Sequence, residues 1–343
     1  EGAERWYIGD KRLFGATTAA VSNYKLPLPY FPPRMEDADP GTQDAHERLK
    51  VMDKQGIYAE ILYPNVAGFG AQNFVHTKDP ELMLECLQVY NDWTAEWCSV
   101  APNRLKAVIS MPFWDVDLCV KEIQRCAKLG HAGVLFGNQM HFMGYPHLSD
   151  PHWNPIWEAV QDVDWSVNFH LANGDPTSGR VSLNNGRQTA YVKGSSMGFM
   201  NSSHQVADVI LSGMVVRYPK VKWVSVESGC SWLPYTLESL DWQWKNSGAI
   251  QEHPEMKYLP SEYFKQSCYV TFWFETEAAI HTIQQCGADN IMFETDYPHP
   301  TSLTVGPHSA AENAREHLER QFRGRLPEAD LQKVLQDNAA KIY

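Results

Sequence analysis

The sequence lacks any stretch suited to crossing a membrane. None of its 343 residues falls in an uninterrupted apolar run of 18, the length at which a transmembrane helix becomes the natural interpretation. The N-terminus also lacks the basic and then apolar segment of a secretory signal. We therefore expect a cytoplasmic protein with no membrane partner.

Positive charge and cysteine are both scarce. Lys and Arg number 29 against 41 Asp and Glu, which gives a formal net charge of -12, and no dense run of basic residues is present. A surface of this kind does not follow a phosphate backbone, so a nucleic-acid partner is excluded. The seven cysteines form no CxxC pair and are odd in number, which disfavours a zinc ribbon or a disulfide scaffold and indicates reduced thiols.

Aromatic residues, by contrast, are abundant. The chain has 12 Trp and 15 Tyr, and large amphipathic rings serve both core packing and the lining of pockets for small organic molecules. A small-molecule substrate is the partner that this composition favours.

The pattern of the chain changes near residue 44. Residues 1–43 are rich in Pro and Gly without a sustained period, which predicts an irregular arm or loop. Residues 44–343 alternate helical and apolar strand patterns, which indicates a single domain built on a parallel sheet. We predict strands that begin near residues 57, 105, 132, 165, 221, 267 and 291, with helices between them.

Seven strands suggest two architectures. A closed (β/α)₈ TIM barrel needs eight, so its first strand would lie in residues 1–43 or upstream of Glu1. An open doubly wound sheet of seven strands is the rival, but no G-x-G-x-x-G turn follows any predicted strand. We therefore favour the barrel.

Three predicted strands end on residues with metal or proton chemistry, namely His170, Glu227 and Asp296. Parallel strands present their C-terminal ends at one face, so these side chains should converge there. Imidazole and carboxylate groups can bind a divalent metal or move a proton. Taken singly, each residue has another explanation. His170 could be a buried core histidine, Glu227 the cap of the next helix, and Asp296 a turn residue.

Longer motifs around these residues resemble the amidohydrolase-related family. They are Val167-Asn-Phe-His170, the segment from Arg217 to Pro234, Asp296-Tyr-Pro-His299 and the closing Asn338-Ala-Ala-Lys-Ile-Tyr343. This branch of the amidohydrolase superfamily includes aminocarboxymuconate-semialdehyde decarboxylase. The resemblance runs from about residue 44 to the C-terminus. It implies a (β/α)₈ barrel with one divalent metal, zinc or alternatively manganese, and a homo-oligomer that is a dimer or larger.

The resemblance also implies roles for single residues. His170 corresponds to the metal ligand of the fifth strand, and Asp296 to the aspartate of the eighth strand, which binds metal and orients water or substrate. The family's first-strand motif, His-x-His or Asp-x-His, is absent from residues 1–43, so we expect the first strand upstream of Glu1. Family decarboxylases carry a histidine where this chain has Glu227, and this difference disfavours decarboxylation.

Four further residues are candidates near the site. His204 precedes the helix predicted from Gln205 and could lean over the rim as a catalytic group, or be a helix N-terminal residue without chemistry. His299 could orient Asp296 or simply belong to a turn. Trp232 and Trp273 follow two strands closely and would line the substrate pocket or pack in the core.

These observations lead to three functional hypotheses. The first is a metal-dependent hydrolase of a small aromatic or aromatic-derived carbonyl substrate, in which Asp296 or Glu227 moves the proton of a metal-activated water. The second is non-oxidative decarboxylation, by a carboxy-lyase, of an aromatic or muconate-like acid. The third is a catalytically silent binding protein.

Overall fold

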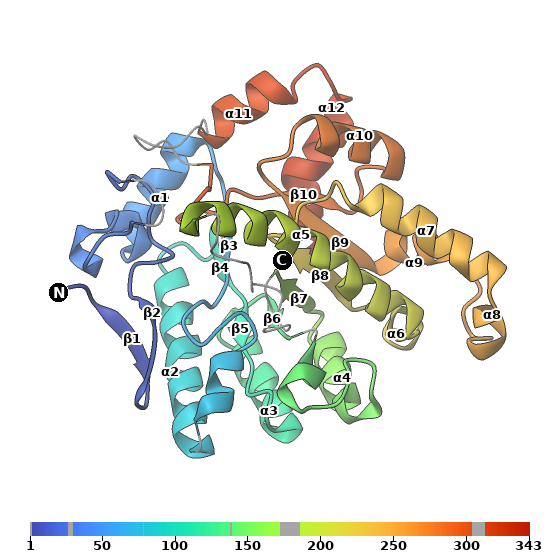
Figure 1. The fold of residues 1–343 in the computed structure, drawn as a ribbon, viewed down its shortest axis with the longest axis horizontal. Coiled ribbons are helices and arrows are strands. Elements are labelled where there is room, and N and C mark those ends of the chain that lie inside the picture. Colours follow the sequence, from blue (N-terminus) through green and yellow to red (C-terminus); the bar gives the residue numbers. More distant parts are fainter. Residues whose placement is uncertain (1, 27–29, 78, 138, 172–185, 304–312) are drawn as a thin grey trace.

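The fold is a parallel β-sheet surrounded by helices (Figure 1). The structure is a computed structural model that describes residues 2–26, 30–77, 79–137, 139–171, 186–303 and 313–343. Strand β3 pairs with β4, and β5, β6, β7, β8, β9 and β10 follow one another as parallel neighbours. Only Val108 separates β4 from β5, so these two form one interrupted strand. The seven predicted strands are thereby confirmed in order and direction.

The strands are short, and most of their residues are buried from end to end, as strands covered on both faces must be. Every residue of β7 and β9 is buried, which explains the apolar runs in the sequence. The bounds are β3 Glu60–Leu62, β4 Leu105–Ala107, β5 Ile109–Ser110, β6 Gly133–Leu135, β7 Ser166–His170, β8 Lys222–Val226, β9 Cys268–Phe272 and β10 Ile291–Phe293.

Helices α1, α2, α3 and α11 begin at an Asp or Asn whose side chain caps them. Asp44 accepts hydrogen bonds from the backbone N–H groups of His46 and Glu47, and Gly56 ends α1 in the left-handed region at φ 74°. The α-helices are α1 Ala45–Gln55, α2 Pro80–Cys98, α3 Val116–Ala127, α4 Asn154–Asp162, α5 Arg187–Leu211, α6 Met214–Arg217, α7 Leu233–Asn246, α8 Ala249–Glu252, α9 Pro260–Ser267, α10 Glu277–Cys286, α11 Ala314–Gln321, α12 Glu328–Gln332 and α13 Asn338–Ile342. Short 3₁₀ turns are η1 Met35–Asp37, η2 Pro40–Thr42, η3 Gln72–His76, η4 Met140–Met143 and η5 Pro151–Trp153, and η7 Lys333–Asp337 is a π-helical turn.

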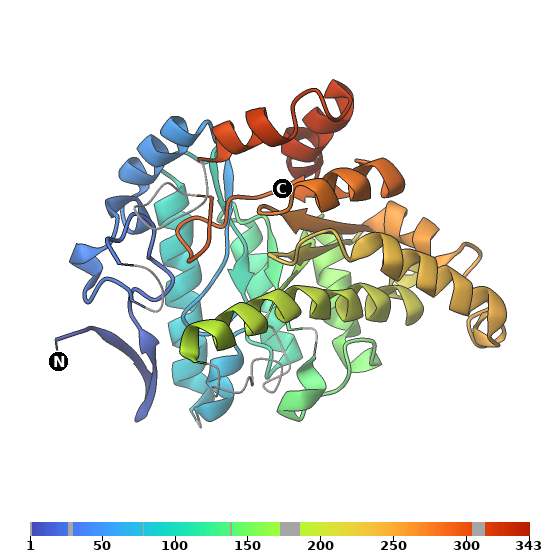
Figure 2. The same ribbon diagram turned by 45° about the horizontal axis from the view of Figure 1, so that its top comes forward.

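Two regions differ from the sequence prediction. The helix expected from Gln205 begins at Arg187 instead, so α5 is 25 residues long and crosses in front of the strands in Figures 1 and 2. Residues 187–203 are rich in Ser and Gly and have a weak helical pattern. Intrinsic helix propensity is therefore low in this part of α5. Packing of Phe199 against Trp273, with ring centroids 5.3 Å apart, stabilises the helix there.

The N-terminal arm is also more regular than predicted. Strands β1 Arg5–Ile8 and β2 Lys11–Gly15 form an antiparallel hairpin, which Figure 2 shows at the edge of the molecule. The division of the chain into an arm of residues 1–43 and a barrel domain of residues 44–343 stays a prediction.

The described residues do not close the sheet by strand pairing. Among them, β3 pairs with β4 alone and β10 with β9 alone, so these two form the edges of the parallel sheet. The C-terminal segment covers the interior near β10, where the side-chain amide of Asn338 donates to the carbonyl oxygens of Ala288 and Ile291 at 2.7 and 2.8 Å. The hydroxyl of the last residue, Tyr343, donates to Oδ1 of Asn168 on β7 at 2.5 Å.

The helices of the structure also bear on whether the chain could cross a membrane. Within the described ranges, every helix is too short or too polar to traverse a bilayer.

The contacts of Asn338 generate a stability prediction. Asn338→Ala removes both hydrogen bonds, so the Ile291 carbonyl loses this partner and the Ala288 carbonyl keeps only the long contact from the Ile291 N–H at 3.5 Å. We expect the free energy of unfolding to fall by about 2 to 4 kcal/mol. Urea denaturation measures the change. The matched control is Asn246→Ala, whose exposed amide donates to the Trp242 carbonyl oxygen at 2.8 Å and should change stability by less than about 0.5 kcal/mol. Equal losses in the two variants would contradict the prediction.

Candidate active site and metal centre

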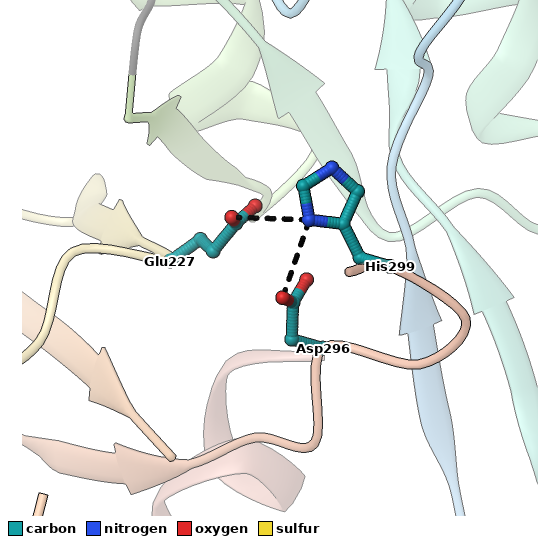
Figure 3. A group of neighbouring side chains, drawn as sticks. All are labelled: Glu227, Asp296 and His299. Carbon is teal, nitrogen blue, oxygen red and sulfur yellow. Dashed lines mark ion pairs between the residues drawn. The ribbon is translucent and has the colours of Figure 1, made fainter. Parts of the chain in front are cut away.

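Acidic and imidazole side chains meet where the parallel strands end. His170 is the last residue of β7, Glu227 directly follows β8, and Asp296 and His299 lie in the loop after β10. Figure 3 shows Glu227 and Asp296 pointing toward the same nitrogen of His299. The convergence predicted from the strand ends is therefore present in the structure.

The distances within this group are short. Nε2 of His170 lies 2.6 Å from Oε2 of Glu227, and Nδ1 of His299 lies 3.3 Å from Oδ2 of Asp296 and 3.7 Å from Oε1 of Glu227. One ligand atom from each of Glu227, Asp296 and His299 lies within 4.8 Å of the others. We call His170, Glu227, Asp296 and His299 the acid–imidazole group.

The backbone is strained at both acids of the group. Glu227 and Asp296 have φ values of 51° and 59°, a left-handed region that residues with a side chain rarely adopt without support. The N–H of Glu227 donates to the hydroxyl of Thr271 at 2.9 Å and so fixes the turn after β8. Strain of this kind gathers at functional sites, and here it aims two carboxylates at one point.

A third buried carboxyl group, Glu294, lies in the same region. Burial, followed by the charges of Glu227 and Asp296, raises the pKa of Glu294 well above its ordinary value. Burial and the charge of Glu227 likewise raise the pKa of Asp296 to about 7, although His299 opposes the shift. The site therefore holds more acidic groups than it can keep ionised without a cation.

Two residues of the group are charged at neutral pH. Burial alone would lower the pKa of His299, but Asp296 and Glu227 outweigh it and raise that pKa to about 9. Burial would raise the pKa of Glu227, but His170 and His299 offset it and lower that pKa. At pH 7, Glu227 is a carboxylate and the Asp296–His299 pair retains at least one proton.

These residues fit a divalent cation. Oε1 of Glu294 is buried with no hydrogen-bond partner among the described residues. Oδ2 of Asp296 is also buried, and the ion-pair contact with Nδ1 of His299 at 3.3 Å does not give it a hydrogen bond of good geometry. Nδ1 of His170 donates to the carbonyl oxygen of Leu171 at 2.8 Å, which leaves the lone pair of Nε2 facing the Glu227 carboxylate. Two such atoms at this distance need a proton or a metal ion between them, and an imidazole whose other nitrogen is held by a backbone carbonyl is a common metal ligand.

Aromatic side chains lie beside the group. The ring of Phe69 stacks on the His170 imidazole with centroids 3.5 Å apart and planes 10° apart. Burial raises the pKa of Tyr191 on α5, and the charges of Asp296 and Glu227 raise it further. Neither Phe69 nor Tyr191 was predicted from the sequence, because neither directly follows a predicted strand. Glu294 was also missed, although its spacing of two from Asp296 was a usable signal.

Trp232 and Trp273, which were predicted to line the pocket, donate hydrogen bonds to backbone carbonyl groups of the loops after β8 and β10. Trp273 is 1% exposed, packs against Phe199, and donates from Nε1 to the carbonyl oxygen of Thr301 at 3.3 Å. Trp232 is half-buried at the start of α7 and donates to the Ser228 carbonyl oxygen at 3.0 Å. Contact of either ring with a substrate stays a prediction.

His204 does not lie where the sequence analysis expected it. It is an exposed residue well inside α5. Burial raises the pKa of nearby Asp208, and the charge of His204 only partly offsets that rise. The structure does not bring it to the acid–imidazole group. The expectation depended on a helix that begins after His204, whereas α5 begins 17 residues before it.

Comparison with known families confirms the resemblance found in the sequence. The model of the amidohydrolase family matches residues 16–343. A curated relative, the gamma-resorcylate decarboxylase of Polaromonas sp. (strain JS666 / ATCC BAA-500), is 28% identical over 259 residues, which cover 73% of this chain and 76% of the relative.

Solved structures are similar along most of the chain. The 2,6-dihydroxybenzoate decarboxylase from Rhizobium superimposes with a TM-score of 0.66 at 24% identity and covers 86% of both chains. The dihydroxybenzoic acid decarboxylase from Polaromonas sp. JS666, with bound manganese and the inhibitor 2-nitroresorcinol, gives 0.65 at 24% identity over 86% of this chain and 84% of that one. This likeness confirms the predicted fold as that of amidohydrolase-type barrels.

The raised pKa values predict how the stability of the metal-free protein depends on pH. Asp296 and His299 bind protons more tightly when folded than when unfolded, so stability is lost as pH rises through about 7 and about 9. The lowered pKa of Glu227 acts only in more acidic solution. We expect the thermal midpoint in excess chelator to fall from pH 6 to pH 9 by roughly 3 °C or more.

The variant Asp296→Asn removes the carboxylate that contributes most to the raised pKa of His299, and it should show a clearly shallower fall between pH 6 and pH 9. Asp289→Asn, an exposed carboxylate paired with Lys333, is the matched control and should follow wild type. A slope in Asp296→Asn as steep as that of wild type would contradict the electrostatic account.

Proposed function

Since the chain belongs to the amidohydrolase family, whose model spans residues 16–343, we propose that it is a metal-dependent non-oxidative decarboxylase of a hydroxylated aromatic acid. The observation that carries the proposal is the likeness to gamma-resorcylate decarboxylase along 73% of the chain. The sequence-based hypotheses placed hydrolysis first and decarboxylation second. The relatives support the second better than the first.

The proposed metal site consists of the acid–imidazole group. Glu227, Asp296 and His299 offer ligand atoms close together, and Nε2 of His170 lies next to Glu227. The buried Oδ2 of Asp296, which lies 3.3 Å from Nδ1 of His299 without a hydrogen bond of good geometry, supports this assignment. A divalent ion there, manganese or zinc, would supply positive charge to the carboxylate and hydroxyl oxygens of the substrate.

The chain's own residues would supply the proton that the reaction consumes. When the bond between the ring and the carboxylate breaks, carbon dioxide leaves and the ring carbon, which keeps the electron pair, must receive a proton. In the metal-free protein, the Asp296–His299 pair holds a proton at neutral pH, with the two groups 3.3 Å apart. Asp296 delivers the proton in this proposal, and His299 restores it.

Hydrolysis remains the second candidate because of Glu227. This residue stands where the family resemblance leads us to expect the histidine of decarboxylases, and its pKa is lowered. An ionised carboxylate cannot readily protonate a ring carbon but can accept a proton from water. In the decarboxylase proposal, Glu227 therefore acts as a metal ligand and as the partner of His170.

Carbon dioxide release tests the proposal directly. Protein stripped of metal is reloaded with Mn²⁺ or Zn²⁺ and given 2,6-dihydroxybenzoate, and the expected result is release of carbon dioxide with formation of the decarboxylated phenol. Asp296→Asn should lower kcat by roughly 10² or more while keeping the fold, because the amide cannot donate a carboxyl proton. Asp289→Asn is the matched control and should keep the wild-type rate.

Other outcomes separate the alternatives. Hydrolysis of aromatic esters or lactones without carbon dioxide release would overturn decarboxylation in favour of the hydrolase. Bound metal with turnover of neither substrate class would favour a binding protein. A near-normal rate in Asp296→Asn would show that Asp296 is not the proton donor.

A further inference from the structure

The loop that carries Asp296 and His299 is held from outside by the N-terminal arm. The backbone N–H groups of Val21 and Ser22 donate to the carbonyl oxygen of Pro298 at 3.1 and 3.2 Å. The hydroxyl of Tyr297 donates to Oδ1 of Asp39 at 3.0 Å. Residues more than 250 positions earlier in the chain thus contact the two residues between Asp296 and His299.

Arg48 of α1 completes these contacts. This arginine is 5% exposed, and its Nε donates to the carbonyl oxygen of Gly41 at 2.6 Å. Its Nη1 lies 2.6 Å from Oε2 of Glu60 at the start of β3. Its guanidinium carbon lies 4.5 Å from the centre of the Tyr297 ring, a distance typical of a cation–π contact.

The approach of the arm to Tyr297 leaves no spare room. A Cβ atom at Gly41 would lie 2.8 Å from the Tyr297 hydroxyl oxygen, so only glycine allows this contact without a shift. The N–H of Gly41 also donates to Oδ1 of Asp39 at 2.9 Å, the same oxygen that accepts from Tyr297. Arm, loop and α1 are therefore packed as one unit.

This support acts on a strained segment. Asp296, directly before Tyr297, has a φ of 59°, a conformation that persists only where surrounding contacts over-determine it. We propose that Asp39, Arg48 and Tyr297 form a clamp that sets the positions of Asp296 and His299, and that all three are positioning residues. This inference rests on the proposed function only for the metal-binding and proton-transfer roles assigned to Asp296 and His299.

The test compares single hydroxyl deletions. Tyr297→Phe keeps the ring under Arg48 and removes the hydrogen bond to Asp39. The matched control is Tyr58→Phe, because Tyr58 also contacts an arginine, with the Arg104 guanidinium carbon 5.6 Å from its ring centre, but is exposed and lies outside the loop after β10. Mn²⁺ affinity is measured by competition with a fluorescent indicator, and hydrogen exchange of residues 295–303 is measured in metal-free protein.

A positioning role has a distinct signature. Loss of one hydrogen bond should weaken Mn²⁺ binding by about 3- to 10-fold in Tyr297→Phe and speed exchange in residues 295–303, with the thermal midpoint nearly unchanged. Tyr58→Phe should match wild type in all three measurements. A lowered midpoint with unchanged metal affinity and loop exchange would show a merely structural role and overturn the clamp.

Variants of Asp39 test whether the effect passes through the hydrogen bond. Asp39→Asn keeps an acceptor oxygen and should retain most of the affinity, whereas Asp39→Ala should resemble Tyr297→Phe. The double variant Asp39→Ala/Tyr297→Phe should bind Mn²⁺ no more weakly than the poorer single variant, because both changes delete the same bond. Additive losses would overturn the coupling. Arg48→Lys, which retains the charge opposite Glu60, should also accelerate loop exchange.

These readouts do not depend on catalysis. If wild type binds Mn²⁺ but releases no carbon dioxide, the proposed function fails while affinity and exchange still decide the clamp. If wild type binds no Mn²⁺, exchange in residues 295–303 decides it alone, and equal exchange in Tyr297→Phe and Tyr58→Phe overturns it.

Discussion

The burial of several acidic groups at one point is the constraint on which the site depends. Glu227, Glu294 and Asp296 share a region with little water, where like charges repel strongly and ionisation is costly. Such an arrangement needs protons, imidazolium groups or a metal ion as compensation. His170 and His299 provide part of it. A divalent ion would replace part of this compensation, so metal affinity and proton affinity are two measures of the same excess of negative charge.

The rest of the structure keeps these groups from moving apart. The acids lie on loops, but each loop is tied to a neighbour. Thr271 on β9 fixes the turn at Glu227, and Glu275 after β9 accepts hydrogen bonds from the N–H groups of Cys230 and Ser231. On the other side, the arm and α1 contact the loop after β10. Loops held in this way combine the reach of a loop with the precision of the sheet.

Hydrolysis and decarboxylation make different demands on this site. Hydrolysis needs a group that takes a proton from water, whereas decarboxylation needs one that gives a proton to carbon. An ionised Glu227 suits the first demand, and the proton shared by Asp296 and His299 suits the second. The same side chains therefore suit both reactions. Decarboxylation is possible only for a substrate that carries a carboxylate on its ring.

The sequence by itself determined the order and direction of seven parallel strands, because apolar runs bounded by Gly and Pro are local signals. It also determined that His170, Glu227 and Asp296 converge, because parallel strands share one C-terminal face. Only the tertiary structure decided that α5 begins at Arg187, that His204 is an exposed residue within this helix, and that Phe69 stacks on His170. The clamp of Asp39, Arg48 and Tyr297 was likewise beyond local patterns. Contacts between distant segments follow from how the whole chain packs, which no short stretch of sequence encodes.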